Sequence, residues 1–191
     1  VVMLSAKIDE SLREWKITVE IRPYVVNFMD WEQADGAKYE SPTYTCPVLS
    51  PDAATVYVNT GNKISNLYAF DVQTGKQKWT FRPTDNGDMQ AESKSMAAVN
   101  PVSGDIYYGT SAGGQFYAVK PDGTLRWKFS KCGSMNSAPP AVSADGTVVY
   151  IVDAKGNLYA LDAETGMERW SAPYAAGSCG YGLLVNGGEV V

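Results

Sequence analysis

Residues Leu67-Tyr-Ala-Phe-Asp-Val-Gln-Thr-Gly-Lys-Gln-Lys-Trp79 contain an aromatic-rich strand, a turn that ends in Gly, and a second strand built around Trp. The same pattern returns in Phe116-Tyr-Ala-Val-Lys-Pro-Asp-Gly-Thr-Leu-Arg-Trp127 and in Leu158-Tyr-Ala-Leu-Asp-Ala-Glu-Thr-Gly-Met-Glu-Arg-Trp170. The three Trp residues are 48 and 43 residues apart. A repeat of forty-odd residues made of short strands is typical of β-propeller blades. The sequence therefore predicts an all-β fold.

Each repeat is predicted to hold four antiparallel strands, which we letter A to D from the propeller axis outward. Strand A is expected at 47–50, 97–100, 140–143 and 182–185, and strand B at 55–60, 105–110 and 148–153. Short segments rich in β-branched and aromatic residues and separated by turn signals fit such strands. The blades then cover about residues 45–82, 95–130 and 138–172, with a partial blade at 180–191. Because propellers usually close with more blades, we expect a piece of a longer propeller.

The turn between strands C and D has a physical reason for its residues. Gly75, Gly123 and Gly166 fall where the hairpin needs a positive φ. The carboxylates of Asp71 and Asp162 can accept backbone N–H bonds and hold the start of the turn. In the second copy Asp122 directly precedes Gly123 in the turn. The indoles are large enough to cover the seam between neighbouring blades, with each N–H bonded to a carbonyl. They belong to Trp79, Trp127 and Trp170. A residue that recurs at the same blade position is better explained by structure than by metal or ligand binding.

Composition excludes several classes of function. The chain has 191 residues, 45% of them hydrophobic, and a formal charge of −5 without a Lys/Arg cluster, so nucleic acid is not an expected partner. No apolar run is long enough to span a membrane. The sequence has no His, which excludes Ser-His-Asp and Cys-His catalysis. We therefore predict no catalytic residues.

The three Cys residues, at 46, 132 and 179, form no Cys-x-x-Cys pair. A sequence-local metal or redox motif is therefore excluded. Cys132 and Cys179 both lie between blades. Either a disulfide bridge or two separate thiols fits this placement.

Residues 1–21 read as a β-hairpin, for which two interpretations remain open. The hairpin can supply strands C and D of a blade, with Trp15 at the seam, so that the two ends of the chain complete a fourth blade. Alternatively, Arg13-Glu-Trp-Lys-Ile-Thr-Val19 resembles the closing strand of an immunoglobulin-like module of gut Bacteroidetes surface proteins. The 23 residues from Arg22 to Tyr44, which separate the hairpin from the first blade, favour the second interpretation.

The shared blade pattern, Tyr-Ala-x-Asp-x-x-Thr-Gly-x-x-x-Trp, resembles the repeat of the pyrroloquinoline-quinone (PQQ)-like, or quinoprotein alcohol dehydrogenase-like, propeller superfamily. The resemblance covers roughly residues 45–191. That superfamily contains quinoprotein alcohol dehydrogenases, the scaffold lipoprotein of the outer-membrane β-barrel assembly complex, and uncharacterised secreted proteins. The resemblance implies an extracytoplasmic location, either secreted or envelope-anchored.

Membership of the enzyme branch would imply a vicinal Cys-Cys disulfide beside the quinone, a bound Ca²⁺ and a catalytic Asp. No two Cys are adjacent in this chain, and no acidic residue lies in a matching catalytic motif. Only the three blade motifs carry over, and enzymes and non-enzymes share them. We therefore predict no cofactor, with PQQ and Ca²⁺ as the alternative.

The linker at residues 22–44 is rich in aromatic residues. Trp31 and Tyr39 belong to a set that could stack on sugar rings or on side chains of a partner. The alternative is a cover strand, Tyr24-Val-Val-Asn-Phe-Met29, packed on the propeller. We expect this packing role more than exposure, because exposed apolar patches of that size are rare on monomers.

Propellers bind ligands through loops, so candidate sites are sought between the strands. The longest loop, 83–94, contains three acidic residues that could bind Ca²⁺, but their spacing does not match a calcium loop. These weak metal candidates are Asp85, Asp88 and Glu92. Polar and aromatic residues of other loops are chosen as rim residues by position alone. They are Lys131, Asn136, Tyr174 and Tyr181.

The sequence thus predicts a non-catalytic β-propeller that binds a protein or a glycan in the cell envelope or outside the cell. A fragment of a PQQ- and Ca²⁺-dependent dehydrogenase is the alternative. A purely architectural role, as spacer or assembly scaffold, also fits. Self-association that completes the ring is a further expectation, because incomplete propellers have free edges.

Overall fold

The computed structural model describes residues 3–9, 14–20, 46–60, 65–83, 95–110, 114–135, 138–173, 185–186 and 189–190. The chain divides into two units, Val1–Tyr39 and Glu40–Val191. The first unit contains a two-stranded antiparallel sheet of β1 (Met3–Asp9) and β2 (Glu14–Glu20). The second unit contains all the other strands.

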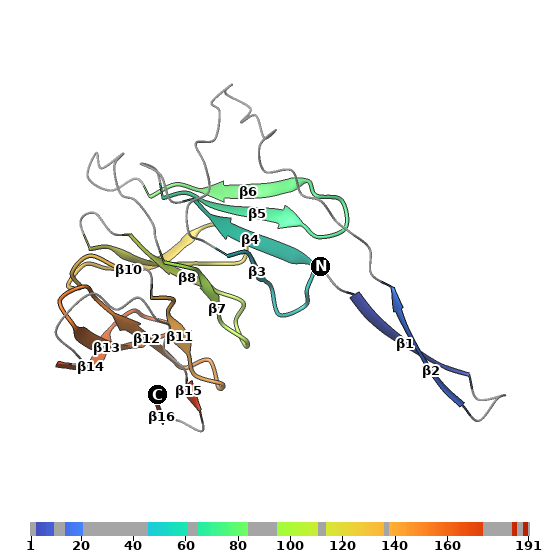
Figure 1. Ribbon diagram of the computed structural model, residues 1–191. Helices are drawn as coiled ribbons and strands as arrows, with labels where there is room; N and C mark the ends of the chain where they lie inside the picture. Colours follow the sequence, from blue (N-terminus) through green and yellow to red (C-terminus); the bar gives the residue numbers. More distant parts are fainter. Residues whose placement is uncertain are drawn as a thin grey trace. The chain divides into compact units, whose positions relative to one another are not determined.

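Three four-stranded antiparallel sheets follow one another along the second unit, each with its strands in chain order (Figure 1). The first blade contains β3 (Val48–Leu49), β4 (Thr55–Asn59), β5 (Leu67–Asp71) and β6 (Gln77–Phe81). The second contains β7 (Ala98–Val99), β8 (Ile106–Gly109), β9 (Phe116–Val119) and β10 (Leu125–Phe129). The third contains β11 (Ala141–Val142), β12 (Val148–Val152), β13 (Asn157–Asp162) and β14 (Glu168–Pro173). The predicted all-β fold of four-stranded blades is confirmed.

Two further strands, β15 (Val185–Asn186) and β16 (Glu189–Val190), pair antiparallel within the range predicted for a partial fourth blade. The innermost strands are shorter than predicted: β3, β7 and β11 have two residues each, where four were expected. Their flanks include prolines such as Pro47 and Pro140, which lack the N–H that a ladder requires. Strand β7 contacts both β3 and β11, so the A strands of neighbouring blades lie next to one another.

All three blades share one register between strands C and D. Trp79, Trp127 and Trp170 each lie opposite the Ala of the Tyr-Ala pair, and a β-bulge on strand D directly precedes each Trp. The β1–β2 hairpin differs, because Trp15 lies opposite Ile8 in an unbroken register. Its resemblance to an immunoglobulin-like module stays a prediction.

The hydrophobic core lies between the blades. Strands β8, β9 and β10 of the second blade contribute Tyr107, Phe116 and Trp127 to one cluster, and the third blade adds Val149 and Ile151. A second cluster joins the first and second blades in the same way. Fully burying one such side chain stabilises a fold by about 1.5–3 kcal/mol. Burial between neighbouring blades therefore stabilises each of these two junctions.

A tryptophan–turn contact fastens each blade to the next one. The Nε1 of Trp79 donates to the carbonyl oxygen of Pro121 at 2.9 Å, and that of Trp127 donates to the carbonyl oxygen of Ala163 at 3.0 Å. Both acceptors lie in the C–D turn of the following blade. The Gly in that turn lies directly against the indole. A Cβ on Gly166 would lie 2.5 Å from Cδ2 of Trp127.

A tyrosine of strand B completes this contact. Tyr107 donates from its hydroxyl to the same carbonyl oxygen of Ala163, at 3.2 Å, and its ring centroid is 5.7 Å from that of Trp127. Only 8% of Trp127 is exposed under the turn of the third blade, whereas Trp170 of the last complete blade is 45% exposed.

The acceptor turn is held by its own carboxylate. Oδ1 of Asp162 accepts hydrogen bonds from the N–H of Thr165 at 2.9 Å and from its hydroxyl at 2.9 Å. The hydrogen bond from Arg169, followed by those from Thr165, lowers the pKa of Asp162 to about 2. Asp71 accepts the equivalent bonds from Thr74 in the first blade.

We expect Gly166→Ala to destabilise the chain more than Gly75→Ala does. Both glycines have a positive φ, of 72° and 68°, so Ala costs about 1–2 kcal/mol at either position. Gly75 is exposed, whereas a Cβ on Gly166 would also meet the Trp127 ring. Urea unfolding of the two variants measures the difference. Equal losses would mean that the approach of the ring to Gly166 contributes nothing to stability.

Candidate binding surface at the ends of the blades

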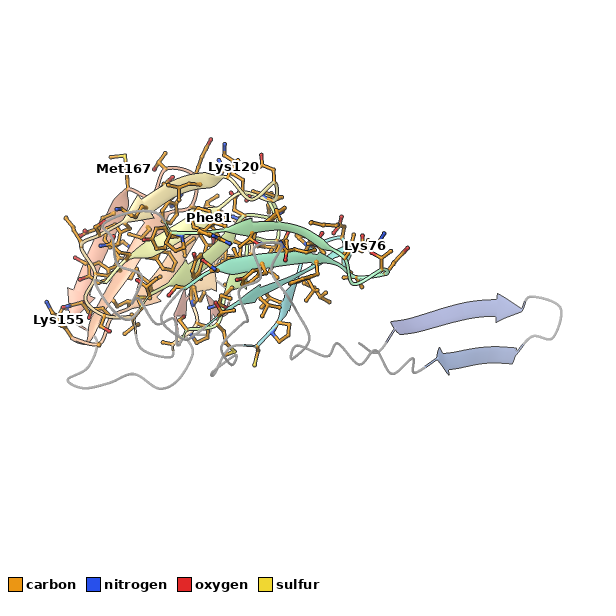
Figure 2. The ribbon with its side chains drawn as sticks, turned by 90° about the horizontal axis from the view of Figure 1, so that it is seen from above. Lys76, Phe81, Lys120, Lys155 and Met167 are labelled. Carbon is orange, nitrogen blue, oxygen red and sulfur yellow. The ribbon has the colours of Figure 1, made fainter. Side chains whose placement is uncertain are left out.

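Antiparallel strands place the connections of each blade at two opposite ends. The A–B and C–D turns lie at one end, which we call the turn edge. The B–C loops and the D–A segments between blades lie at the other, which we call the loop edge. In Figure 2, Lys76, Lys120 and Met167 mark the C–D turns, and Lys155 marks a B–C loop.

Of the rim residues chosen from the sequence, the structure describes Lys131. Its Nζ lies 3.0 Å from Oε2 of Glu168 on β14, so it joins neighbouring blades through an exposed ion pair. The hydrogen bond from Lys131 lowers the pKa of Glu168. The other candidate binding residues lie outside the described part of the chain. They are Trp31, Tyr39, Asp85, Asp88, Glu92, Asn136, Tyr174 and Tyr181.

Sequence reasoning missed the most heavily bonded group of the loop edge, the buried carboxylate of Asp153. Its Oδ1 accepts from the backbone N–H groups of Lys155 and Asn157, both at 2.9 Å. Its Oδ2 accepts from the N–H of Gly133 at 2.9 Å and from the hydroxyl of Tyr159 at 3.2 Å. The carboxylate thus ties the D–A segment before the third blade to the B–C loop of that blade. The only sequence signal was its position at the end of a predicted strand.

Burial acts to raise the pKa of Asp153, but these N–H and O–H donors outweigh it and leave the pKa below its ordinary value. Burial, with the nearby charge of Asp153, raises the pKa of the Cys132 thiol to about 12. The same two causes raise the pKa of Tyr159 to about 12. Near neutral pH, Cys132 and Tyr159 are therefore protonated.

Cys132 is a free, buried thiol whose Sγ lies 3.1 Å from the carbonyl oxygen of Gly114. Its proposed bridge to Cys179 concerns a residue outside the described ranges. A protonated, buried thiol is a poor nucleophile. Its role here is packing.

Other polar groups at the loop edge bind neighbouring blades together. The side-chain amide of Asn59 donates to the carbonyl oxygen of Ser95 at 2.7 Å. The hydroxyl of Ser95 donates to the carbonyl oxygen of Ala138 at 2.7 Å, and that of Tyr108 donates to Ser65 at 3.0 Å. These buried groups stabilise the seams between blades.

Among the described residues of the loop edge, no donor set fits PQQ with Ca²⁺. Calcium takes six to eight oxygen ligands, several of them carboxylates. Both oxygens of Asp153 are already used by donors of the protein, and no group of three or more His, Cys, Asp or Glu gathers among the described residues. Cys132 has no adjacent Cys with which to form the vicinal disulfide.

Comparison with known proteins identifies the repeats. A family model described as outer membrane protein assembly factor BamB matches residues 27–130 and 112–191. The serine/threonine-protein kinase AfsK of Streptomyces griseus is 31% identical over 170 residues, which cover 84% of this chain and 20% of the kinase. The quinoprotein ethanol dehydrogenase of Pseudomonas aeruginosa is 29% identical over 131 residues, covering 61% of this chain and 21% of the enzyme.

The crystal structure of BamB from Moraxella catarrhalis superposes with a TM-score of 0.55 at 19% identity, over 71% of this chain and 38% of that one. This similarity confirms the propeller fold. The chain spans about a fifth of the length of the kinase and of the dehydrogenase. Within the described residues, no helix is long and apolar enough to cross a membrane.

We expect Asp153→Asn to lower the free energy of unfolding at pH 7 by about 1–3 kcal/mol, because the charge is lost and the donors on one of the two oxygens then face an NH2 group that cannot accept. The pKa of Asp153 is lowered from 3.8 in the folded chain. Its stabilising effect is therefore present above about pH 4 and is lost as the pH falls towards the native pKa. Urea unfolding between pH 7 and pH 3 measures this.

The wild type and Asp153→Asn should thus differ most at pH 7 and converge in acid. Glu164→Gln, which changes an exposed carboxylate, serves as the control. A difference that stays constant across this pH range would contradict the charged role of Asp153.

Proposed function

Because the chain belongs to the PQQ-like propeller family whose model is described as outer membrane protein assembly factor BamB, we propose that it is a non-catalytic module that binds a protein partner in the cell envelope or outside the cell. Three kinds of protein share these repeats: an assembly factor, a kinase and a quinoprotein dehydrogenase. Their names describe different activities on one type of scaffold, so the repeat itself specifies none of them.

One observation carries the non-catalytic part of the proposal. The buried ionisable groups at the described loop edge, Cys132, Asp153 and Tyr159, are bonded to one another or to the backbone. A catalytic acid, base or nucleophile needs a pKa suited to its task and access to a substrate. Here the pKa values of Cys132 and Tyr159 are raised to about 12, and Asp153 is saturated with donors. These groups support structure rather than a reaction.

A protein partner is favoured over a glycan by the exposed apolar side chains. Val102 and Met167, at the turn edge, are 71% and 70% exposed. Exposed aliphatic groups on a rigid scaffold suit the apolar part of a protein interface. Sugar recognition would use the aromatic residues Trp31 and Tyr39, which fall outside the described ranges.

A photo-crosslinking amino acid at Lys155 or Met167 tests this proposal in the full-length protein within its own cell envelope. Lys155 lies at the loop edge and Met167 at the turn edge, and both are exposed. We expect a discrete protein adduct from at least one of them. Ser171, exposed in the middle of the outer strand β14 and away from both edges, serves as the control and should give none.

Absence of a protein adduct at both edges would overturn the proposed function. Replacing Trp31 and Tyr39 with Ala then tests the glycan alternative. Loss of binding on a glycan array, with the fold intact, would support that alternative.

The dehydrogenase alternative predicts a different result. A ligand that binds only the folded state at a hundred times its Kd adds about 2.7 kcal/mol to stability. We expect saturating PQQ with Ca²⁺ to leave the thermal midpoint of the chain unchanged, since no described donor set fits them. A rise in the midpoint that requires both additives would favour the quinoprotein dehydrogenase.

A further inference from the structure

One exposed side chain of the turn edge carries a sulfur atom. Met167 follows the glycine of the third C–D turn and is 70% exposed (Figure 2). Its backbone is fixed, because its carbonyl oxygen accepts from the N–H of Asp162 at 2.8 Å and its own N–H donates to the hydroxyl of Thr165 at 3.3 Å. Within the described residues its side chain has no hydrogen bond or ring contact, so the thioether is open to solvent.

The position of Met167 is polar in the other two blades. Counted from the turn glycine, its equivalents are Lys76 after Gly75 and Thr124 after Gly123. All three side chains are exposed. The turn therefore needs no apolar group at this position, since it forms with an ammonium group or a hydroxyl there. A polar group at residue 167 should leave the turn folded.

Met135 has the opposite environment. It is 1% exposed in the core between the second and third blades. Its side chain lies against the backbone of Gly109, where a Cβ would be 2.6 Å from Cγ of Met135. An oxygen atom added to this sulfur would need space and a hydrogen-bond donor, which a close-packed core does not offer. A solvent-borne reagent reaches Met135 only when the junction opens, whereas it meets Met167 in the folded chain.

We propose that Met167 is a site of reversible oxidation by oxidants of the peroxide class. The thioether sulfur attacks one oxygen of hydrogen peroxide, the O–O bond breaks, an S–O bond forms, and the second oxygen leaves as water. The sulfur loses two electrons and the peroxide accepts them, which gives methionine sulfoxide. A methionine sulfoxide reductase reverses the step with two thiols, which form a disulfide while the oxygen leaves as water.

Oxidation at this position changes the surface of the turn edge and leaves its fold intact. Methionine sulfoxide is polar, so the apolar contact that Met167 offers is lost. The proposed function assigns the exposed aliphatic side chains of this edge to a protein interface, and oxidation should therefore weaken capture of the partner there. That consequence rests on the proposed function, whereas the oxidation of Met167 does not.

Limited treatment of the 191-residue chain with hydrogen peroxide, followed by mass spectrometry of tryptic peptides, tests the site. Trypsin cuts after Lys131, Lys155 and Arg169, so Met135 and Met167 fall on separate peptides. We expect the Met167 peptide to take up one oxygen about ten times faster than the Met135 peptide, or more. In concentrated urea the two rates should become equal, which controls for intrinsic reactivity. Reductase with dithiothreitol should remove the oxygen from Met167.

The thermal midpoint tests whether the fold is unaffected. Met167→Leu keeps an apolar side chain and has no sulfur at this position, so it is the matched control. After the same peroxide treatment, the wild type and Met167→Leu should have equal thermal midpoints. A fall in the wild type alone would contradict a change confined to the surface.

A photo-crosslinking amino acid at Glu164, an exposed residue of the same turn, tests the loss of contact in the full-length protein. Peroxide should lower the yield of protein adduct about fourfold in the otherwise wild-type chain, the effect of losing roughly one buried methylene. It should have no effect when Met167→Leu is also present. Met167→Gln, which is polar and of similar length, should give the low yield without peroxide.

Equal oxidation rates of Met167 and Met135 in the folded chain, or an oxygen that the reductase does not remove, would overturn the site. An adduct at Glu164 that peroxide leaves unchanged would reject the loss of contact, as would an adduct that forms only at Lys155. If no protein adduct forms at either edge, the proposed function fails, while the peptide masses still decide whether Met167 is the oxidation site.

Discussion

The architecture depends on the packing of one tryptophan against one glycine of the next blade. The indole of Trp127 covers Gly166 and donates to Ala163, and the same carbonyl also accepts from Tyr107. A Cβ at residue 166 would lie 2.5 Å from Cδ2 of Trp127, so the indole would have to move away from the turn that accepts its hydrogen bond. Because the core lies between blades, this contact is also what closes the apolar faces against one another.

The blade fold could be predicted because its requirements repeat. Each copy has an acceptor carboxylate, a glycine of positive φ and then an indole; in the third blade these are Asp162, Gly166 and Trp170. Three copies of this order in the sequence make the pattern recognisable. The length of strand A could not be read in the same way. Its residues satisfy an alternating pattern, but where pairing stops depends on prolines and on turns such as that after Ser50.

The candidate site was less predictable, because its residues do not repeat. Asp153 accepts donors from Gly133, a residue of the preceding D–A segment, and no local spacing announces such a contact. Asp105 is likewise explained only by comparing blades. Lys120 of the second blade occupies the turn position that is Asp71 in the first blade and Asp162 in the third. The carboxylate that pairs with Arg126 is instead that of Asp105, before strand B. The positions at which one blade differs from the others are therefore the ones that the repeat pattern cannot predict.

The tryptophan–turn contact has a direction, since each blade offers its indole forward and its glycine turn backward along the chain. Dividing such an array between two blades leaves two unlike surfaces. The piece that ends the array displays an apolar indole, as the 45% exposure of Trp170 shows, whereas the piece that begins it displays a polar turn like that of Asp71 and Gly75. Removing blades from the C-terminal side therefore exposes apolar surface that favours association. A soluble fragment then needs a capping blade or a polar substitution at the exposed indole.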